Sequence, residues 1–116
     1  MKPLDLAKEL AKSIASSTEY LNYKSAKEKL ETHEAAKLMF DDFRKKQLEL
    51  QRKKLSGEKA LEPLETEIRK LTEVVSLNLY VRDFLMAEYQ FSKMMMDVQK
   101  TLSEAVDIKL PEEFGG

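Results

Sequence analysis

Residues that interrupt helices are rare in this chain, and their positions are regular. The sequence contains three glycines and three prolines, and all but one of these six stand near the ends of segments with helical periodicity. No segment alternates apolar and polar residues over the length of a strand, and β-branched residues are sparse. The pattern therefore predicts an all-α fold, a helical bundle or array of about five helices with short joints.

Three helices are expected in the first half of the chain, where apolar residues recur three and four positions apart. The first spans residues 3–15, and the second runs through Leu30, capped by a hydroxyl among residues 16–18. The third, a long helix, opens at residue 32 or 33 and ends after Leu55. The apolar face of the first comprises Leu6, Leu10, Ala11 and Ile14, and that of the third comprises Ala36, Met39, Phe40, Phe43, Gln47 and Leu50.

Two further helices are expected in the second half. Gly57 suits the left-handed residue that closes the third helix, and residues 58–62 read as a polar loop. A fourth helix spans residues 63–75, and a long last helix, capped by Asn78, spans residues 79–106.

A length of 116 residues fits one domain, here expected over residues 1–106, with 107–116 as a frayed C-terminal tail. The formal net charge of −1 argues against a global field for nucleic acid or membranes. The chain has no cysteine, no signal-peptide pattern and no apolar run long enough to cross a bilayer. We expect a cytoplasmic protein with no membrane partner.

The last helix carries apolar residues over more of its circumference than one core contact requires. With about 100° per residue, Phe84, Phe91, Met95, Val98, Leu102 and Val106 share one face. Four other residues point elsewhere: Leu85, Met86, Tyr89 and Met96. A second buried side in so small a chain predicts self-association through this helix, most simply as a homodimer.

Two other features of this helix need an interpretation. Adjacent methionines at positions 94–96 diverge on a helix and cannot converge on one ion, so core and interface packing is favoured over a metal site. Glu88 lies on the apolar face between Phe84 and Phe91. Pairing with a facing helix is the favoured explanation, and a role in binding or in specifying the oligomer is the alternative.

Enzyme chemistry has little support in the sequence. His33 is the sole histidine, which excludes a two-histidine di-iron site, and its place at a helix start suits a cap or surface residue. No glycine-rich phosphate loop or nucleophile elbow occurs. We predict no catalytic residues, cofactor, metal or small-molecule substrate.

One basic cluster stands out in the third helix. It contains six basic residues and one acid: Arg44, Lys45, Lys46, Arg52, Lys53 and Lys54, with Glu49. Such a stripe could bind RNA phosphates, but no aromatic residue interleaves with it to stack on bases. Leu48 and Leu55, seven residues apart and opposite the main apolar stripe, favour a protein partner for this surface.

Two long stretches of the sequence resemble a known family. "HEAAKLMFDDFRKKQLELQRKKLSG" and "AEYQFSKMMMDVQKTLSEAV" are similar to the YheA-like branch of the bacterial YlbF/YmcA-type family of small helical proteins. The matching features include the break at Gly57 and the pair Ala87 and Glu88. His33 stands where the family usually has an acidic cap, and Leu79 where it usually has a proline.

The resemblance implies a cytoplasmic, all-helical, oligomeric and non-catalytic protein. Some better-studied relatives are implicated as accessory factors in ribonuclease Y-dependent RNA processing and in competence, and some hold an iron–sulfur cluster through cysteines. This chain has no cysteine to hold one. The sequence thus favours a protein-binding adaptor or regulatory accessory factor, with an RNA-binding accessory factor as the alternative.

Overall fold

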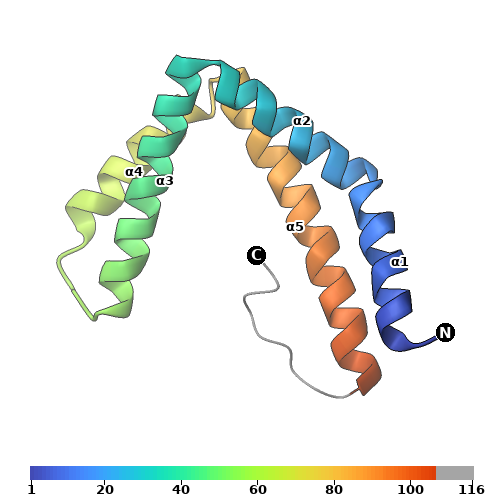
Figure 1. The fold of residues 1–116 in the computed structure, drawn as a ribbon. Coiled ribbons are helices and arrows are strands. Elements are labelled where there is room, and N and C mark those ends of the chain that lie inside the picture. Colours follow the sequence, from blue (N-terminus) through green and yellow to red (C-terminus); the bar gives the residue numbers. More distant parts are fainter. Residues whose placement is uncertain (107–116) are drawn as a thin grey trace. The chain divides into compact units, whose positions relative to one another are not determined.

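The computed structural model describes residues 1–106, and these form five α-helices with no strand among them. The helices are α1 (Pro3–Ala15), α2 (Thr18–Thr32), α3 (Glu34–Leu55), α4 (Glu62–Val75) and α5 (Leu79–Val106) (Figure 1). The predicted all-α class with long third and last helices is confirmed. The predicted tail, 107–116, lies outside the described residues.

Local signals at the helix ends act as the sequence predicts. The Asn78 Oδ1 atom accepts hydrogen bonds from the backbone N–H groups of Tyr80 and Val81, at 3.0 and 3.1 Å. The Ser17 hydroxyl accepts one from the Tyr20 N–H at 3.2 Å, at the start of α2. Gly57 has φ of 82°, the left-handed conformation that closes α3.

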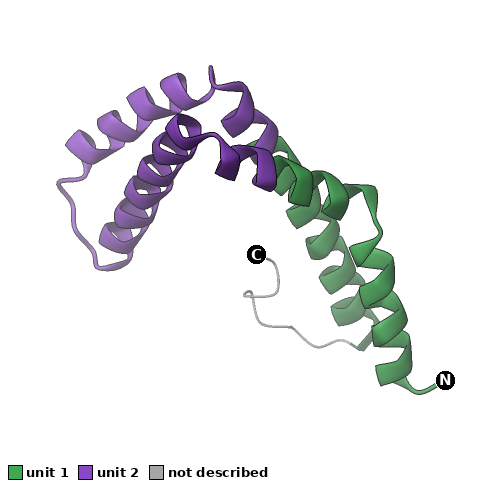
Figure 2. Ribbon diagram, turned by 45° about the horizontal axis from the view of Figure 1, so that its top comes forward, with its two compact units in different colours: residues 1–26, 85–116 green, residues 27–84 purple. Residues whose placement is uncertain are grey.

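The described chain divides into two compact units, and α2 and α5 contribute residues to both (Figure 2). Unit 1 comprises residues 1–26 and 85 onward, and unit 2 comprises residues 27–84. The prediction of a single domain over residues 1–106 stays a prediction.

Unit 2 contains every residue that the described chain buries. In this unit α3 and α4 lie side by side (Figures 1 and 2), and the Phe40 and Phe84 rings meet edge to face at 5.1 Å. The buried residues are Leu30, Ala36, Phe43, Leu61, Val75, Val81 and Phe84. The predicted α3 face is therefore largely correct, although Gln47 is exposed.

Unit 1 is held by aromatic and apolar contacts that only half-bury their members. The Phe91 ring of α5 lies 5.5 Å from the Tyr20 ring and 5.2 Å from the Tyr23 ring, both on α2. Such ring pairs stabilise packing beyond the area that they bury. They attach α2 to α5, while α1 lies alongside the later turns of α5.

Candidate interaction surfaces

The helices of unit 1 leave most of their apolar side chains exposed. Among its described residues none is buried, and ten large apolar side chains are exposed. They are Met1, Leu4, Leu6, Leu10, Leu21, Met86, Tyr89, Met96, Leu102 and Val106. Exposed apolar side chains that gather in patches mark interaction sites, so unit 1 is the first candidate for an interface.

This exposure corrects two expectations from the sequence. Leu6 and Leu10 were expected to be buried on the first helix, and Leu102 and Val106 on the last, but all four are exposed. The pattern correctly identifies an apolar face, but burial requires a neighbour, and within described unit 1 the last turns of α5 have only α1 beside them. Ile14 is the one residue of that predicted α1 face that is half-buried.

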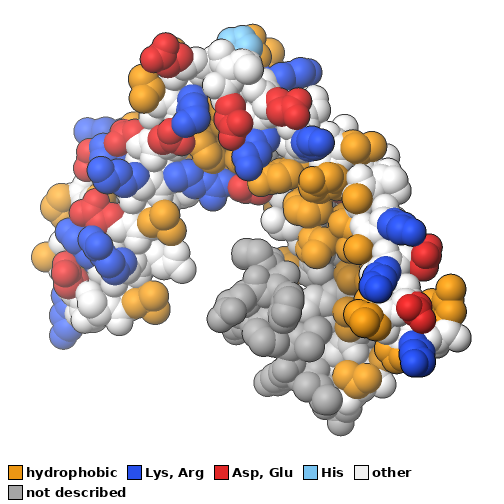
Figure 3. Space-filling model, viewed as in Figure 1, with side chains coloured by type: hydrophobic (Ala, Val, Ile, Leu, Met, Phe, Trp, Pro, Cys, Tyr) orange, Lys and Arg blue, Asp and Glu red, His pale blue; other side chains and the backbone are white. Residues whose placement is uncertain are grey.

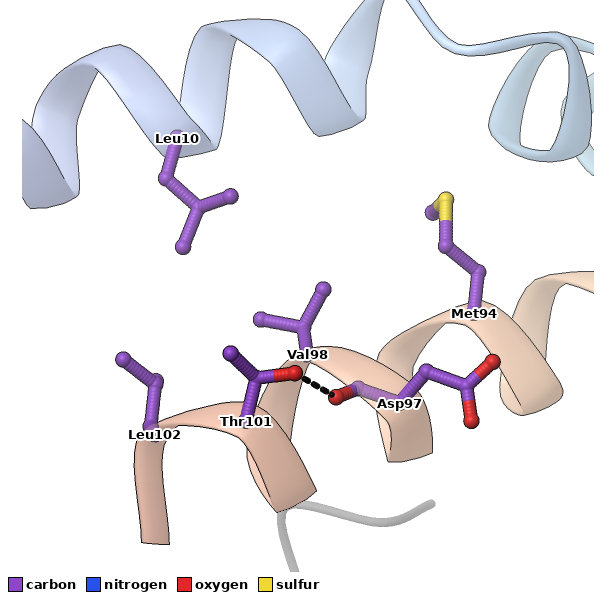
Figure 4. A pocket seen from close by; sticks show the side chains of 6 residues that line it. All are labelled: Leu10, Met94, Asp97, Val98, Thr101 and Leu102. Atoms are coloured by element: carbon purple, nitrogen blue, oxygen red, sulfur yellow. Dashed lines mark hydrogen bonds between the residues drawn. The ribbon is translucent and has the colours of Figure 1, made fainter. Parts of the chain in front are cut away.

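A hollow of about 290 Å³ lies between α1 and α5 within unit 1. Figure 4 shows Leu10 pointing from α1 toward α5, and Met94, Val98 and Leu102 pointing from α5 toward α1. The residues that line it are Leu10, Met94, Asp97, Val98, Thr101 and Leu102. The Thr101 hydroxyl donates to the Asp97 backbone carbonyl at 2.8 Å, so this polar group is satisfied within the helix.

The four residues predicted to mediate self-association are mostly exposed. Met86, Tyr89 and Met96 are 63%, 65% and 56% exposed, and Leu85 is half-buried. Met94 and Met95 are half-buried, so the methionine row divides between two sides of α5.

Glu88, the acid on the apolar face, is half-buried and makes an interaction with the rest of the chain. No buried side-chain nitrogen or oxygen in the described residues lacks a hydrogen-bond partner. Glu88 is therefore not without a partner, and both pairing with a facing helix and a role in specifying an oligomer stay predictions.

Three of the basic residues of α3 are already engaged inside unit 2. The Lys46 Nζ atom lies 2.7 Å from Glu67 Oε1 of α4 and 3.3 Å from Asp42 Oδ2. Lys53 pairs with Glu49 at 3.5 Å, and the Arg44 guanidinium lies 5.0 Å from the Phe40 ring centroid. These contacts brace α3 within unit 2 and partly neutralise the basic cluster.

The ion pair between α3 and α4 also shifts the titration of Lys46. Hydrogen bonds to Glu67 first, and then to Asp42, stabilise the ammonium form and raise the pKa of Lys46 above 10.5. Because Lys46 and Glu67 belong to different helices, this pair is a direct electrostatic link across the packed α3–α4 hairpin.

Two of the three remaining residues of the basic cluster, Lys45 and Arg52, lie on the outer side of α3, whereas Lys54, eleven residues after buried Phe43, lies on the side of Phe43. Lys45, Arg52 and Lys54 are exposed and make no ion pair with the described chain, residues 1–106. Leu48 and Leu55 are 65% and 83% exposed on the same helix. Figure 3 shows basic, acidic and apolar side chains interspersed over α3 and α4, and orange apolar side chains gathered over parts of unit 1.

A shallow hollow of about 280 Å³ lies on this outer side of α3, lined by Lys45, Leu48, Glu49 and Arg52. The sequence analysis paired Lys45 with Arg52, and both line this hollow. We call the outward side of α3 that contains it the outer face of α3; its predicted members are Lys45, Leu48, Arg52 and Leu55.

Some contacts were missed by the sequence analysis. The His33 ring stacks on the Tyr80 ring, with centroids 3.7 Å apart. Its Nδ1 atom lies 2.7 Å from the Lys29 carbonyl oxygen, so this nitrogen carries the hydrogen, and the side chain does not cap α3. Leu38, 64% exposed, was also overlooked on the outer face of α3. Its spacing could have indicated it, because residues three and seven positions apart, such as Leu38, Asp41 and Lys45, share one side of a helix.

The described residues contain neither a candidate metal site nor a candidate membrane-spanning helix. Within residues 1–106 no group of three or more His, Cys, Asp or Glu side chains could hold a metal ion. No helix in that range has both the length and the apolar composition needed to cross a membrane. The absence of catalytic, cofactor and metal residues stays a prediction.

The fold and its surfaces define a small all-α protein with little buried core and extensive exposed helical faces. The chain belongs to the YlbF/YmcA family, because the family model described as "Control of competence regulator ComK, YlbF/YmcA" matches residues 4–107. The YheA-like branch inferred from the sequence stays a prediction within that family.

Curated relatives match over nearly the whole chain. A UPF0342 protein of Caldicellulosiruptor saccharolyticus is 40% identical over 96% of this chain and 92% of the relative. A UPF0342 protein of Symbiobacterium thermophilum is 37% identical over 92% of this chain and 96% of the relative. A UPF0342 protein of Desulfitobacterium hafniense is 35% identical over 98% of this chain and 92% of the relative. No solved structure matches the chain significantly.

Proposed function

We propose that this protein is a non-catalytic homo-oligomer that acts as a protein-binding adaptor or regulatory accessory factor. The observation that carries the proposal is that described unit 1 buries no residue while exposing ten large apolar side chains. Helices of the length of α1 are marginal in water without packing, and a partner that covers the exposed apolar side chains of unit 1 would add to the packing that α5 supplies.

Self-association through α5 supplies such a surface. Tyr89 and Met96 lie on one flank of the helix, within about 20° of one another on a helical wheel. Both are exposed, and neither contributes to the Phe91 contacts with α2. A symmetric dimer would cover the same flank on both copies.

The outer face of α3 is the proposed surface for binding protein. Its basic and apolar residues alternate, which suits a partner that presents leucine-sized side chains and carboxylates. The description of the family names control of the competence regulator ComK, and a protein that regulates by binding is compatible with that role.

A matched pair of variants tests the self-association. Met96→Glu places a charge on the exposed apolar flank, and Gln90→Glu places the same charge on an exposed position of α5 away from it. We expect Met96→Glu to weaken the oligomer at least about tenfold, because burying a carboxylate in an apolar contact is costly. Gln90→Glu should leave it unchanged. Equal masses for both variants by light scattering would contradict the proposal.

The alternative function is RNA binding, as an accessory factor in RNA processing with ribonuclease Y, and the free ammonium and guanidinium groups of Lys45, Arg52 and Lys54 support it. Binding through phosphates would weaken steeply as salt is raised and after charge reversal at Lys45 and Arg52. The engagement of Lys46 and Lys53 with acids of this chain lowers the charge available to RNA. Co-purification of partners that survives ribonuclease treatment would favour the adaptor.

A further inference from the structure

The outer face of α3 has a regular spacing that its role in unit 2 does not require. Six of its residues follow one another at intervals of three, four, three, four and three: Leu38, Asp41, Lys45, Leu48, Arg52 and Leu55. This is the spacing of the two seam positions of a heptad repeat. Arg52 lies nine residues from buried Phe43, half a turn away around the helix, so the seam points away from the unit's core.

The side chains of this seam are exposed in the described chain. Leu38, Leu48 and Leu55 are 64%, 65% and 83% exposed, and Asp41, Lys45 and Arg52 are exposed as well. Single exposed leucines are ordinary on protein surfaces. Three of them on one heptad seam, on a helix whose opposite face makes the core, are typical of a helix that packs against a second helix.

The hollow on this face is lined by residues at the spacing that such packing uses. Its lining residues are Lys45, Leu48, Glu49 and Arg52, at positions i, i+3, i+4 and i+7. In coiled coils, each seam residue inserts into a hole formed by four residues of the facing helix. These four are the set that forms such a hole on an α-helix.

We propose that the outer face of α3 pairs with the same face of a second copy of this chain, antiparallel, as a short two-helix coiled coil. The inference rests on the proposed function, because it names the protein that this binding surface takes. The two seams run in opposite directions, so that the first seam residue of one copy faces the last seam residue of the other. Leu38 of each copy then meets Leu55 of the other copy, once at each end of the pair.

The charges on the seam select this orientation. In the antiparallel register Asp41 meets Arg52 of the second copy, twice by symmetry, and the aliphatic stem of Lys45 packs on Leu48 of the second copy. Glu49 of the second copy falls one residue further along, within reach of the Lys45 ammonium. A parallel pair would place Asp41 on Asp41, Lys45 on Lys45 and Arg52 on Arg52, which like-charge repulsion disfavours.

Three acidic residues on or beside the seam are already paired within each helix. Asp41 makes an exposed ion pair with Lys37 at 3.3 Å, a kind of contact that contributes little and can be replaced. Asp42 and Glu49, which approach each other across an antiparallel pair, are bound to Lys46 at 3.3 Å and to Lys53 at 3.5 Å. Their repulsion is therefore reduced.

Disulfide cross-linking of the full chain tests the pairing, and it is clean because the chain has no native cysteine. In the double variant Leu38→Cys/Leu55→Cys, mild oxidation should give a covalent dimer, since the two thiols face each other across copies. Leu38→Cys alone should not cross-link, because two copies of position 38 would lie about 25 Å apart along the helix axis. Leu55→Cys alone should behave in the same way.

Charge exchange in the same double-cysteine chain tests the orientation. Asp41→Arg and Arg52→Asp should each slow dimer formation about tenfold, because two attractive pairs become repulsive in each case. Combining Asp41→Arg with Arg52→Asp should restore the rate. Circular dichroism of each variant checks that the helices remain folded.

Several outcomes would overturn the inference: no covalent dimer from the double-cysteine chain, single-cysteine chains that cross-link as readily, or charge variants that leave the rate unchanged. Adding Met96→Glu separates this inference from the proposed function. If the double-cysteine chain with Met96→Glu still cross-links while the mass of its oligomer falls, both the α3 pairing and the α5 contact are supported. A mass that does not respond to Met96→Glu would contradict the α5 contact alone.

Discussion

At the scale of the residue, Asn78 connects a local sequence signal to the start of the longest helix. Its carboxamide oxygen accepts hydrogen bonds from two backbone N–H groups at the first turn of α5, those of Tyr80 and Val81. Val81 is also the least exposed residue of the described chain, at 0%. The cap thus fixes the point where α5 enters the core of unit 2.

We predict that Asn78→Ala lowers the free energy of unfolding by about 1 kcal/mol, the usual effect of losing a side-chain cap. Asn22→Ala, at an exposed position inside α2, is the matched control and should not lower it, because alanine has the higher helix propensity. Urea unfolding at one fixed protein concentration measures both. Equal losses in the two variants would mean that the cap does not stabilise α5.

The Lys46–Glu67 pair predicts a dependence on alkaline pH. Because the folded-state pKa of Lys46 is raised above 10.5, its contribution to stability is fully present below that pH. The contribution is lost as the pH rises through the folded-state pKa. Glu67→Gln removes the hydrogen bond that contributes most to the raised pKa of Lys46. This variant should therefore lose less stability than the natural chain as the pH rises above 10.5. Thermal unfolding at pH 9 and above 10.5 compares them, and parallel pH profiles would contradict the role of the pair.

At the scale of the element, helix positions are predictable because their signals are local. The periodicity of three and four, the Asn78 and Ser17 caps and the left-handed Gly57 all lie within a few residues of the end that they define. Predicted and observed bounds accordingly agree closely along the chain. The His33–Tyr80 stack joins residues far apart in sequence, and no local pattern indicates it.

The two sides of α5 should respond differently to the same change. Met95 is half-buried on the side of Phe91, while Met96 is exposed. At a protein concentration low enough for both variants to be monomeric, Met95→Glu should lower the free energy of unfolding by about 2 kcal/mol. Met96→Glu should change it by less than about 0.5 kcal/mol. The reverse order in chemical denaturation would show that the two faces of α5 are exchanged.

At the scale of the whole molecule, the sequence reveals the apolar faces but not which of them the chain itself covers. The α3 face that contains Ala36 and Phe43 is buried, because α4 lies against it, whereas Leu6 and Leu10 on α1 are exposed. Periodicity records the side on which apolar residues gather, and burial depends on neighbours supplied by distant segments or other chains. The self-association of α5 is predicted because this helix carries apolar residues on more of its circumference than one core contact requires.

The two proposed association surfaces, on α5 and on the outer face of α3, are also helix faces that the described chain does not cover. The sequence indicated part of the outer face of α3, Lys45, Leu48, Arg52 and Leu55, but not Leu38 and Asp41, which lie N-terminal to the basic cluster. Two self-complementary surfaces on one chain would give an assembly larger than a dimer, of closed symmetry if the geometry allows.

Sedimentation equilibrium of the unmodified chain at low micromolar concentration is the most direct test of the claim that unit 1 is completed by another chain. We predict a mass of at least twice the 13.4 kDa of one chain, and a lower mass in Met96→Glu, where only the α3 pairing remains, but not in Gln90→Glu. A folded, helical species of 13.4 kDa over the whole concentration range would contradict the account.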